Sequence, residues 1–157
     1  MRVQESAGWT ADAAVIGGGA VGLAVARALA LRGVRRVSLI ERGRLGAEAS
    51  GAAGGMLAVQ AEADREDAFL KLARAGLSLY PAFADALREE TGVDVELERT
   101  GTLYLAFTEK DLAEVEHRYA WQRAAGLAVE RLTAEEAREV EPCVSERVRG
   151  ALRFPLD

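Results

Sequence analysis

One segment near the amino terminus constrains the fold more than any other. An apolar run over residues 12–16 is followed by Gly17, Gly19 and Gly22 and then by an alanine-rich stretch that continues to residue 30. A second apolar run, residues 36–40, ends in Glu41. This order and spacing are typical of a strand, a glycine turn, a helix and a second strand that together bind a dinucleotide.

Each marked residue has its own physical role in this prediction. Gly17 permits a tight turn, Gly19 lets a pyrophosphate approach the backbone, and Gly22 lets the helix lie against the strand. The helix that begins near Ala20 directs unpaired N–H groups and a positive dipole end at the phosphates. Glu41 is placed to accept hydrogen bonds from ribose hydroxyls. A glycine turn that only packs a helix on a sheet would leave Glu41 unexplained.

The residues after Glu41 bear on which dinucleotide is bound, because NAD and FAD domains begin alike. Residues 42–57 are mostly small and show no hydrophobic periodicity. Glycine and alanine allow the backbone to approach a flat ligand and to offer N–H groups to its oxygens. A flexible surface loop is the alternative, but the apolar end of the segment, Met56-Leu57, favours a ligand-binding role.

Residues 12–107 resemble the amino-terminal part of the FAD-dependent amino acid oxidases, and within them the glycine oxidase branch. The matching pieces are Val15–Gly22, Glu41, Ala49-Ser50, Ala52–Leu57, Asp67–Phe69, Leu79-Tyr80, Thr91–Asp94 and Gly101–Phe107. The resemblance implies FAD as cofactor. It places FAD contacts at Ala20, Val21, Glu41, Arg42, Ala49, Ser50, Gly54, Gly55 and Met56, in addition to the three turn glycines. Ala49 stands where relatives often have a hydroxyl, so one hydrogen bond is in doubt.

The resemblance also implies an activity. A small amino acid such as glycine, or another small amine, becomes an imine, and dioxygen becomes hydrogen peroxide, in the context of thiamine biosynthesis. The family's substrate-binding arginine and tyrosine would lie beyond residue 157, so we expect no catalytic residue in this chain. Sarcosine oxidase, D-amino acid oxidase and dehydrogenase relatives remain open, as do an NAD-linked dehydrogenase and a non-catalytic, split-chain dinucleotide-binding module. Expected partners are the substrate, dioxygen, the rest of the polypeptide or a complementing chain, and a second copy in a homo-oligomer.

The expected fold class is α/β, with a Rossmann-like start followed by the α+β beginning of a substrate domain. We expect a loose extension over residues 1–10, an FAD-binding portion over 11–90 and a truncated substrate domain over 91–157. The fold is expected to be incomplete, because two parallel strands and their crossover cannot form a buried sheet.

Local patterns predict the elements of the second half. Apolar spacing predicts a helix over 64–80, and Pro81 predicts a kink or a second helix over 82–90. Residues 93–98 and 102–107 are predicted to pair as a hairpin. Capping signals predict helices from Thr108 to residue 125 and from Thr133 to a point before Pro142, and residues 150–154 are predicted as a strand.

Composition narrows the function classes. The net charge of −5 and pI near 5.1 argue against nucleic acid and anionic membranes as partners. Residues 1–9 lack an apolar core typical of a signal peptide, and one cysteine, Cys143, suits a reducing compartment, so we expect a cytoplasmic protein. No metal-ligand cluster is visible in the sequence. His117 and the Glu/Arg mixture over 114–118 are interpreted as a solvated helix face with i,i+4 pairs.

Overall fold

A computed structural model describes residues 10–157, and the predicted extension over residues 1–10 lies outside the described residues except for Thr10. The chain divides into two compact units, the first ending at Met56 and the second running from Leu57 to Asp157. The predicted domain boundary near residue 91 stays a prediction.

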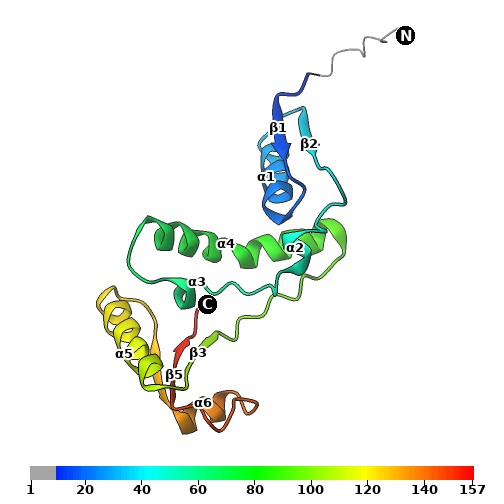
Figure 1. Ribbon diagram of the computed structural model, residues 1–157. Helices are drawn as coiled ribbons and strands as arrows, with labels where there is room; N and C mark the ends of the chain where they lie inside the picture. The colour runs from blue at the N-terminus through cyan, green and yellow to red at the C-terminus, as the bar shows by residue number, and fades with distance from the viewer. Residues whose placement is uncertain (1–9) are drawn as a thin grey trace. The chain divides into compact units, whose positions relative to one another are not determined.

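The first unit contains the predicted strand–helix–strand. Strand β1 (Ala13–Ile16), helix α1 (Ala20–Leu31) and strand β2 (Val37–Ile40) follow one another, and a short helix, α2 (Ala49–Ala52), comes after them (Figure 1). The two strands pair in parallel, with Ala13 opposite Val37 and Ile16 opposite Ile40. The connection between parallel strands is the helix α1, as a βαβ unit requires. The Rossmann-like start is therefore confirmed.

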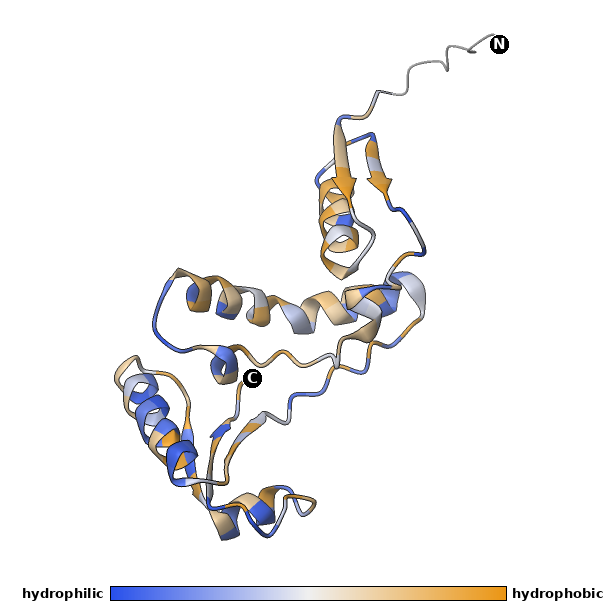
Figure 2. Cartoon of the chain, viewed as in Figure 1, coloured by the Kyte–Doolittle hydropathy of each residue, from blue (hydrophilic) through white to orange (hydrophobic). Residues whose placement is uncertain are grey.

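The apolar side chains of this unit remain largely uncovered. Figure 2 shows β1, β2 and α1 in predominantly hydrophobic colours, yet no residue of α1 is buried. Ile16 at the end of β1 is 85% exposed, and Ile40 at the end of β2 is 55% exposed. Parallel sheets are normally covered on both faces. These residues alone therefore do not close a core, in agreement with the predicted incomplete fold.

The second unit is of α+β type. Its helices are α3 (Val59–Glu62), α4 (Ala68–Thr91), α5 (Glu109–Ala124) and α6 (Ala134–Val140), and its strands are β3 (Thr102–Ala106), β4 (Glu130–Thr133) and β5 (Gly150–Phe154). The sheet has the order β3-β5-β4, and both pairings are antiparallel. One core cluster, which includes Val115, Leu152 and Phe154, lies between α5 and this sheet.

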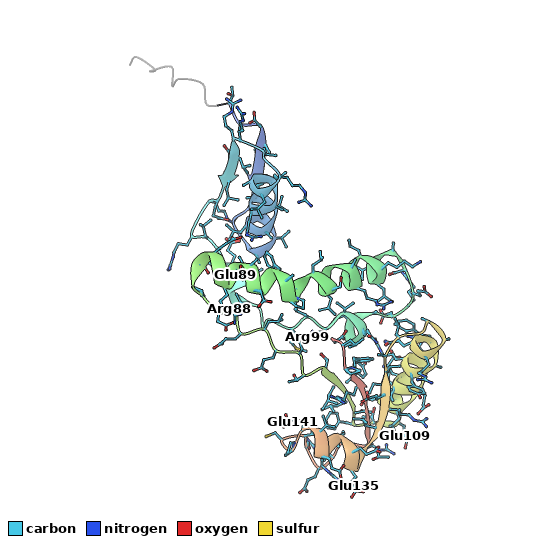
Figure 3. All side chains as sticks on the ribbon, turned by 180° about the vertical axis from the view of Figure 1, so that it is seen from behind. Arg88, Glu89, Arg99, Glu109, Glu135 and Glu141 are labelled. Atoms are coloured by element: carbon cyan, nitrogen blue, oxygen red, sulfur yellow. The ribbon has the colours of Figure 1, made fainter. Side chains whose placement is uncertain are left out.

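Exposed charged side chains cover much of the outer surface of the second unit. The side chains labelled in Figure 3 lie on α4, α5 and α6 and on the connecting segments, and all of them are exposed. Across the part of the chain that the structure describes, no helix has the length and apolarity to cross a membrane.

The predicted hairpin between residues 93–98 and 102–107 is wrong. Residues 93–98 form no strand, and β3 pairs instead with β5, so that Thr102 lies opposite Phe154. Gly101 does not serve a hairpin turn: its φ is +86°, and a Cβ there would lie 2.8 Å from the carbonyl oxygen of Phe154. The hairpin was predicted because the two β-rich segments are neighbours in the sequence. The partner of β3 in the structure, β5, lies about fifty residues further along the chain.

Local signals at the helix ends are confirmed. Thr108 and Asp111 form a capping box at α5, and Thr133 and Glu136 form another at α6. Pro81 lies inside one continuous helix, α4, so a second helix does not begin there. Strand β4 and the short helices α2 and α3 were not predicted.

Candidate functional site

The turn between β1 and α1 is fixed by its backbone. Gly17 has a φ of +102°, a conformation that side-chain-bearing residues rarely adopt. Its N–H donates to the carbonyl oxygen of Ile40 at 2.8 Å, so the ladder between the two strands continues into the turn. Gly17 is therefore required for the fold itself.

Gly22 and Gly19 lack side chains for different reasons. A Cβ on Gly22 would overlap the carbonyl oxygen of Gly17 and lie 3.5 Å from a methyl group of Val15. Gly22 is thus required by the packing of α1 against the turn and β1. Gly19 has ordinary extended backbone, with φ −79° and ψ −179°, and a Cβ there would meet only the Ser50 side chain, with Oγ at 2.9 Å. Because a hydroxyl can rotate away, the fold places only a weak demand for glycine at position 19.

The amino terminus of α1 is open toward the turn. Gly19 is its N-cap and provides no side-chain hydrogen bond. The N–H of Ala20 donates to Ser50 Oγ at 2.9 Å. A serine hydroxyl that accepts from an amide still has its own proton to donate. Ser50 therefore offers a hydroxyl donor to an anion at the positive end of α1.

The carboxylate of Glu41 lies at the same turn. Its Oε2 accepts from the N–H of Gly18 at 2.7 Å, and its Oε1 accepts from the N–H of Gly43 at 2.8 Å. These backbone hydrogen bonds, that from Gly18 first, hold the pKa of Glu41 below its ordinary value and keep the group charged. Each carboxylate oxygen can accept more than one hydrogen bond. Glu41 can therefore accept from sugar hydroxyls without releasing the turn.

The structure brings some of the predicted contact residues together and leaves others apart. Gly17, Gly19, Ala20, Gly22, Glu41 and Ser50 gather around the turn. Val21 is 79% exposed in the first turn of α1. Arg42 forms an ion pair with Glu48 on the surface, and Ala49 begins α2.

Gly54, Gly55 and Met56 lie outside this group. Met56 is 72% exposed, and a Cβ on Gly54 or Gly55 would meet no heavy atom within 4 Å. Gly55 has a φ of +79° and so requires glycine for its backbone, whereas Gly54 is constrained neither by a positive φ nor by packing. Their assignment to the cofactor stays a prediction.

The sequence analysis missed Gly18 and Leu45. Gly18 is buried, and a Cβ there would overlap a methyl group of Leu45 and lie 3.2 Å from Glu41 Cβ. This glycine lets the Glu41 side chain reach the turn. Nothing in the motif spacing singles it out, because its position in the glycine pattern tolerates any residue.

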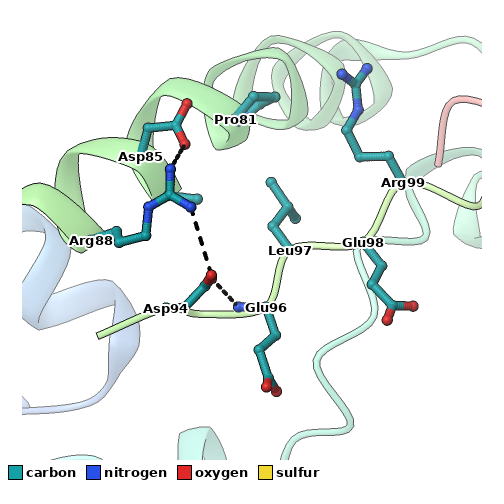
Figure 4. A pocket seen from close by; sticks show the side chains of 9 residues that line it. Pro81, Asp85, Arg88, Asp94, Glu96, Leu97, Glu98 and Arg99 are labelled. Carbon is teal, nitrogen blue, oxygen red and sulfur yellow. Dashed lines mark hydrogen bonds and ion pairs between the residues drawn. The ribbon is translucent and has the colours of Figure 1, made fainter. Parts of the chain in front are cut away.

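A hollow of about 520 Å³ lies between α4 and residues 94–99 in the second unit (Figure 4). One of its arginines, Arg88, donates to Asp85 at 3.3 Å and approaches Asp94 at 3.7 Å. Pro81 and Leu97 add an apolar wall. None of the predicted cofactor residues lines this hollow, so it is a separate feature.

Known proteins similar to this chain share its arrangement. The glycine oxidase of Geobacillus kaustophilus is 40% identical over 147 residues, which cover 93% of this chain and 39% of that protein. Its crystal structure superposes with a TM-score of 0.88 at 39% identity, over 94% of this chain and 40% of that one. The L-proline dehydrogenase of P. horikoshii gives a TM-score of 0.75 at 26% identity, over 94% of this chain and 37% of that one.

The chain therefore spans about 40% of the length of the relatives it matches, and it corresponds to their amino-terminal part. The family model for FAD dependent oxidoreductases matches residues 12–157, nearly the whole described chain. The predictions of fold class and of FAD as the cofactor are confirmed at the level of the family. The chain belongs to the DAO family of FAD dependent oxidoreductases.

Proposed function

We propose that this chain is the amino-terminal part of an oxidase that binds FAD at the glycine turn and acts on glycine or another small amino acid or amine. The observation that supports this most directly is Gly19. Its backbone is ordinary and its only close neighbour is a rotatable hydroxyl, so the fold alone gives little reason for the missing side chain. A pyrophosphate that approaches the backbone supplies that reason.

The turn residues divide the work of binding. The Ser50 hydroxyl, which accepts from the Ala20 N–H, donates its own proton to the pyrophosphate, and the positive end of α1 adds a favourable field. Glu41 accepts from the adenosine ribose while its bonds to Gly18 and Gly43 hold it in place. The Gly54, Gly55 and Met56 segment lies along the flavin, and Arg42 lies near the adenosine, as the family resemblance suggests.

The chemistry follows from the cofactor class. Bound FAD supplies the two-electron redox chemistry, and the protein supplies binding and orientation. In the proposed overall reaction the CH–NH group of the amine loses two electrons and two protons, and the amine becomes an imine. Dioxygen accepts the two electrons and the two protons and becomes hydrogen peroxide. The similarity to glycine oxidases supports an amino acid substrate and an oxidase.

A dehydrogenase is the second candidate. The L-proline dehydrogenase of P. horikoshii shares the fold over 94% of this chain, so this part of the molecule fits an enzyme that passes electrons to an acceptor other than oxygen. Sarcosine and D-amino acids are alternative substrates. A non-catalytic, split-chain binding module would bind FAD without turnover.

The test uses the protein expressed from the complete gene that encodes this chain. We expect a yellow preparation that releases FAD on denaturation and forms hydrogen peroxide with glycine, and we would assay sarcosine and D-alanine in parallel. Amine-dependent bleaching of the flavin without peroxide would favour the dehydrogenase. A colourless protein that cannot be loaded with FAD would contradict the proposal.

Other parts of the proposal follow from sequence and family resemblance. A role in thiamine biosynthesis is in keeping with a relative named Bifunctional protein ThiO/ThiG, which is 41% identical over 85 residues. A cytoplasmic location, a homo-oligomer and a complementing chain stay predictions from the sequence.

A further inference from the structure

A polar cluster in the second unit holds the short helix α3. Arg118 and Gln122 on α5 are 8% and 0% exposed, and neither has a role in the proposed site. The interpretation of residues 114–118 as a solvated face is correct for the exposed His117 and wrong for Arg118. Burying a polar or charged side chain costs free energy unless its polar atoms form hydrogen bonds. The hydrogen-bond partners of Arg118 and Gln122 therefore indicate which part of the fold they stabilise.

Arg118 binds the end of α3 with most of its guanidinium. Its Nη1 donates to the carbonyl oxygens of Ala61 and Ala63, both at 2.9 Å, and its Nη2 donates to Asp64 at 2.8 Å. Its Nε donates to Glu114 at 2.7 Å, and the group lies 4.9 Å from the ring centre of Tyr104. One of these bonds thus reaches Ala61 within α3, and two reach the residues just after the helix.

Gln122 and Asp157 bind the start of the same helix. The Gln122 amide accepts from Gln60 Nε2 at 2.9 Å and donates to the Gln60 carbonyl oxygen at 3.0 Å. The Asp157 carboxylate accepts from the N–H of Gln60 at 2.8 Å and from that of Ala61 at 2.9 Å. Both ends of α3 are therefore hydrogen-bonded to distant parts of the unit.

A helix as short as α3 depends on contacts with the rest of the unit. Four residues do not form a stable helix alone, because the free-energy cost of nucleation exceeds the gain from one hydrogen-bonded turn. Val59 also packs against one core cluster of the unit and Ala61 against the other. Hydrogen bonds and packing together fix α3 in one position.

The segment that α3 follows is the one assigned to the flavin. Met56 lies two residues before Ala58, and two residues span at most about 7 Å of extended chain. A Cβ placed on Gly54 or Gly55 would have no heavy atom within 4 Å. Packing against neighbouring residues therefore restricts the backbone of this segment very little. The fixed point closest in sequence after these residues is α3.

We propose that Arg118, Gln122 and Asp157 form an anchor that fixes α3 and thereby limits the motion of the Gly54–Met56 segment, which the proposed function assigns to the flavin. These are positioning residues, and the inference rests on the proposed function. The anchor belongs to the second unit, whereas the Gly54–Met56 segment and the proposed phosphate and ribose contacts belong to the first. Along the chain, the Gly54–Met56 segment adjoins α3 and the glycine turn does not. Loss of the anchor should therefore loosen this segment and leave the glycine turn unchanged.

The experiment compares Arg118→Met and Gln122→Met with Arg149→Met in the protein from the complete gene. Arg149 bonds an exposed partner, Glu109, and lies outside the anchor, so it is a matched control. In FAD-free protein, both anchor variants should raise amide hydrogen exchange at residues 54–57 by about tenfold or more, because local opening becomes easier. Arg149→Met should stay at the wild-type rate. Arg118→Lys, which retains one cationic donor group, should fall between.

FAD binding supplies the second readout. Both anchor variants should weaken FAD binding by roughly tenfold, in line with a loss of preorganisation, and shift the flavin absorption band.

Faster exchange confined to residues 58–64, with residues 54–57 unchanged, would overturn the anchor. Faster exchange at 54–57 with unaltered FAD affinity and spectrum would overturn its role toward the cofactor. If wild-type protein fails to bind FAD, the proposed function is wrong, and so is the role of the anchor toward the cofactor. The exchange data would still show whether the anchor restrains residues 54–57. Should Arg118→Met fail to fold, Gln122→Met gives the same comparison.

Discussion

The same substitution at two helical glycines should have opposite effects on stability. In α4, Gly76→Ala places a methyl group where no heavy atom lies within 4 Å. Alanine stabilises a helix interior by ~0.5–1 kcal/mol relative to glycine. We therefore expect Gly76→Ala to raise the free energy of unfolding by about that amount.

In α1, Gly22→Ala gains part of the same helix propensity but meets the Gly17 carbonyl oxygen. The position of the new Cβ is fixed by the backbone of α1, and the Gly17 oxygen is main chain in a residue held by its hydrogen bond to Ile40, so relief requires α1 to move away from β1. Overpacking of this kind costs ~1–3 kcal/mol. The expected net effect in the protein from the complete gene is a destabilisation of ~1–2 kcal/mol.

Urea unfolding of wild type and both variants, followed by circular dichroism, measures the two effects on one scale. The two changes in free energy should differ in sign. Equal stabilisation by both variants would show that α1 does not pack on the turn as closely as described. It would also remove the packing reason for Gly22.

Three further predictions concern single carboxylates. Glu41→Gln should weaken FAD binding by roughly ten- to hundredfold, the scale for hydrogen bonds to a charged acceptor, and an unchanged dissociation constant from a flavin titration would exclude Glu41 from the site. Backbone N–H groups of Phe107 and Thr108 lower the pKa of Asp111 below 3.8, so the stability advantage of wild type over Asp111→Asn should persist above that pH and disappear as the pH falls through the lowered value. A constant difference in urea unfolding from pH 7 to pH 3 would speak against this. Burial raises the pKa of Asp157 above 3.8, so the pH dependence of its contribution to stability is opposite to that of Asp111. Relative to Asp157→Asn, wild type should lose stability as the pH rises through the raised value. An increase in its relative stability over that pH range would be inconsistent with the burial.

Sequence patterns predicted the elements whose signals are local. The capping boxes at Thr108 and Thr133 are each made by residues three positions apart, and both form as expected. The glycine turn is also local in its backbone demands, since Gly17 requires a positive φ whatever surrounds it. Such features depend little on the rest of the fold.

The errors arise where distant parts of the chain decide. β3 pairs with β5, and no property of residues 93–98 reveals that the better partner lies near residue 152. Pro81 lies within α4 although the missing N–H predicted a break or a kink. Periodicity likewise could not show that Arg118 is buried, because its partners come from the separate segment over residues 61–64.

The candidate site shows the same division. The spacing of the glycines predicted the turn, and the acid at the end of β2 predicted the carboxylate beside it. The role of Gly18 follows only from the position of Leu45, and the contact between Ser50 and Ala20 spans thirty residues. Neither contact has a sequence signature of its own.

The central claim is that the bare backbone at Gly19 makes room for the pyrophosphate of FAD. FAD titration of the apoprotein from the complete gene, wild type beside Gly19→Val, tests it most directly. The account predicts that wild type binds FAD and that Gly19→Val remains folded but binds none, because the added side chain fills the space of the phosphate. Equal FAD occupancy in both proteins would contradict it.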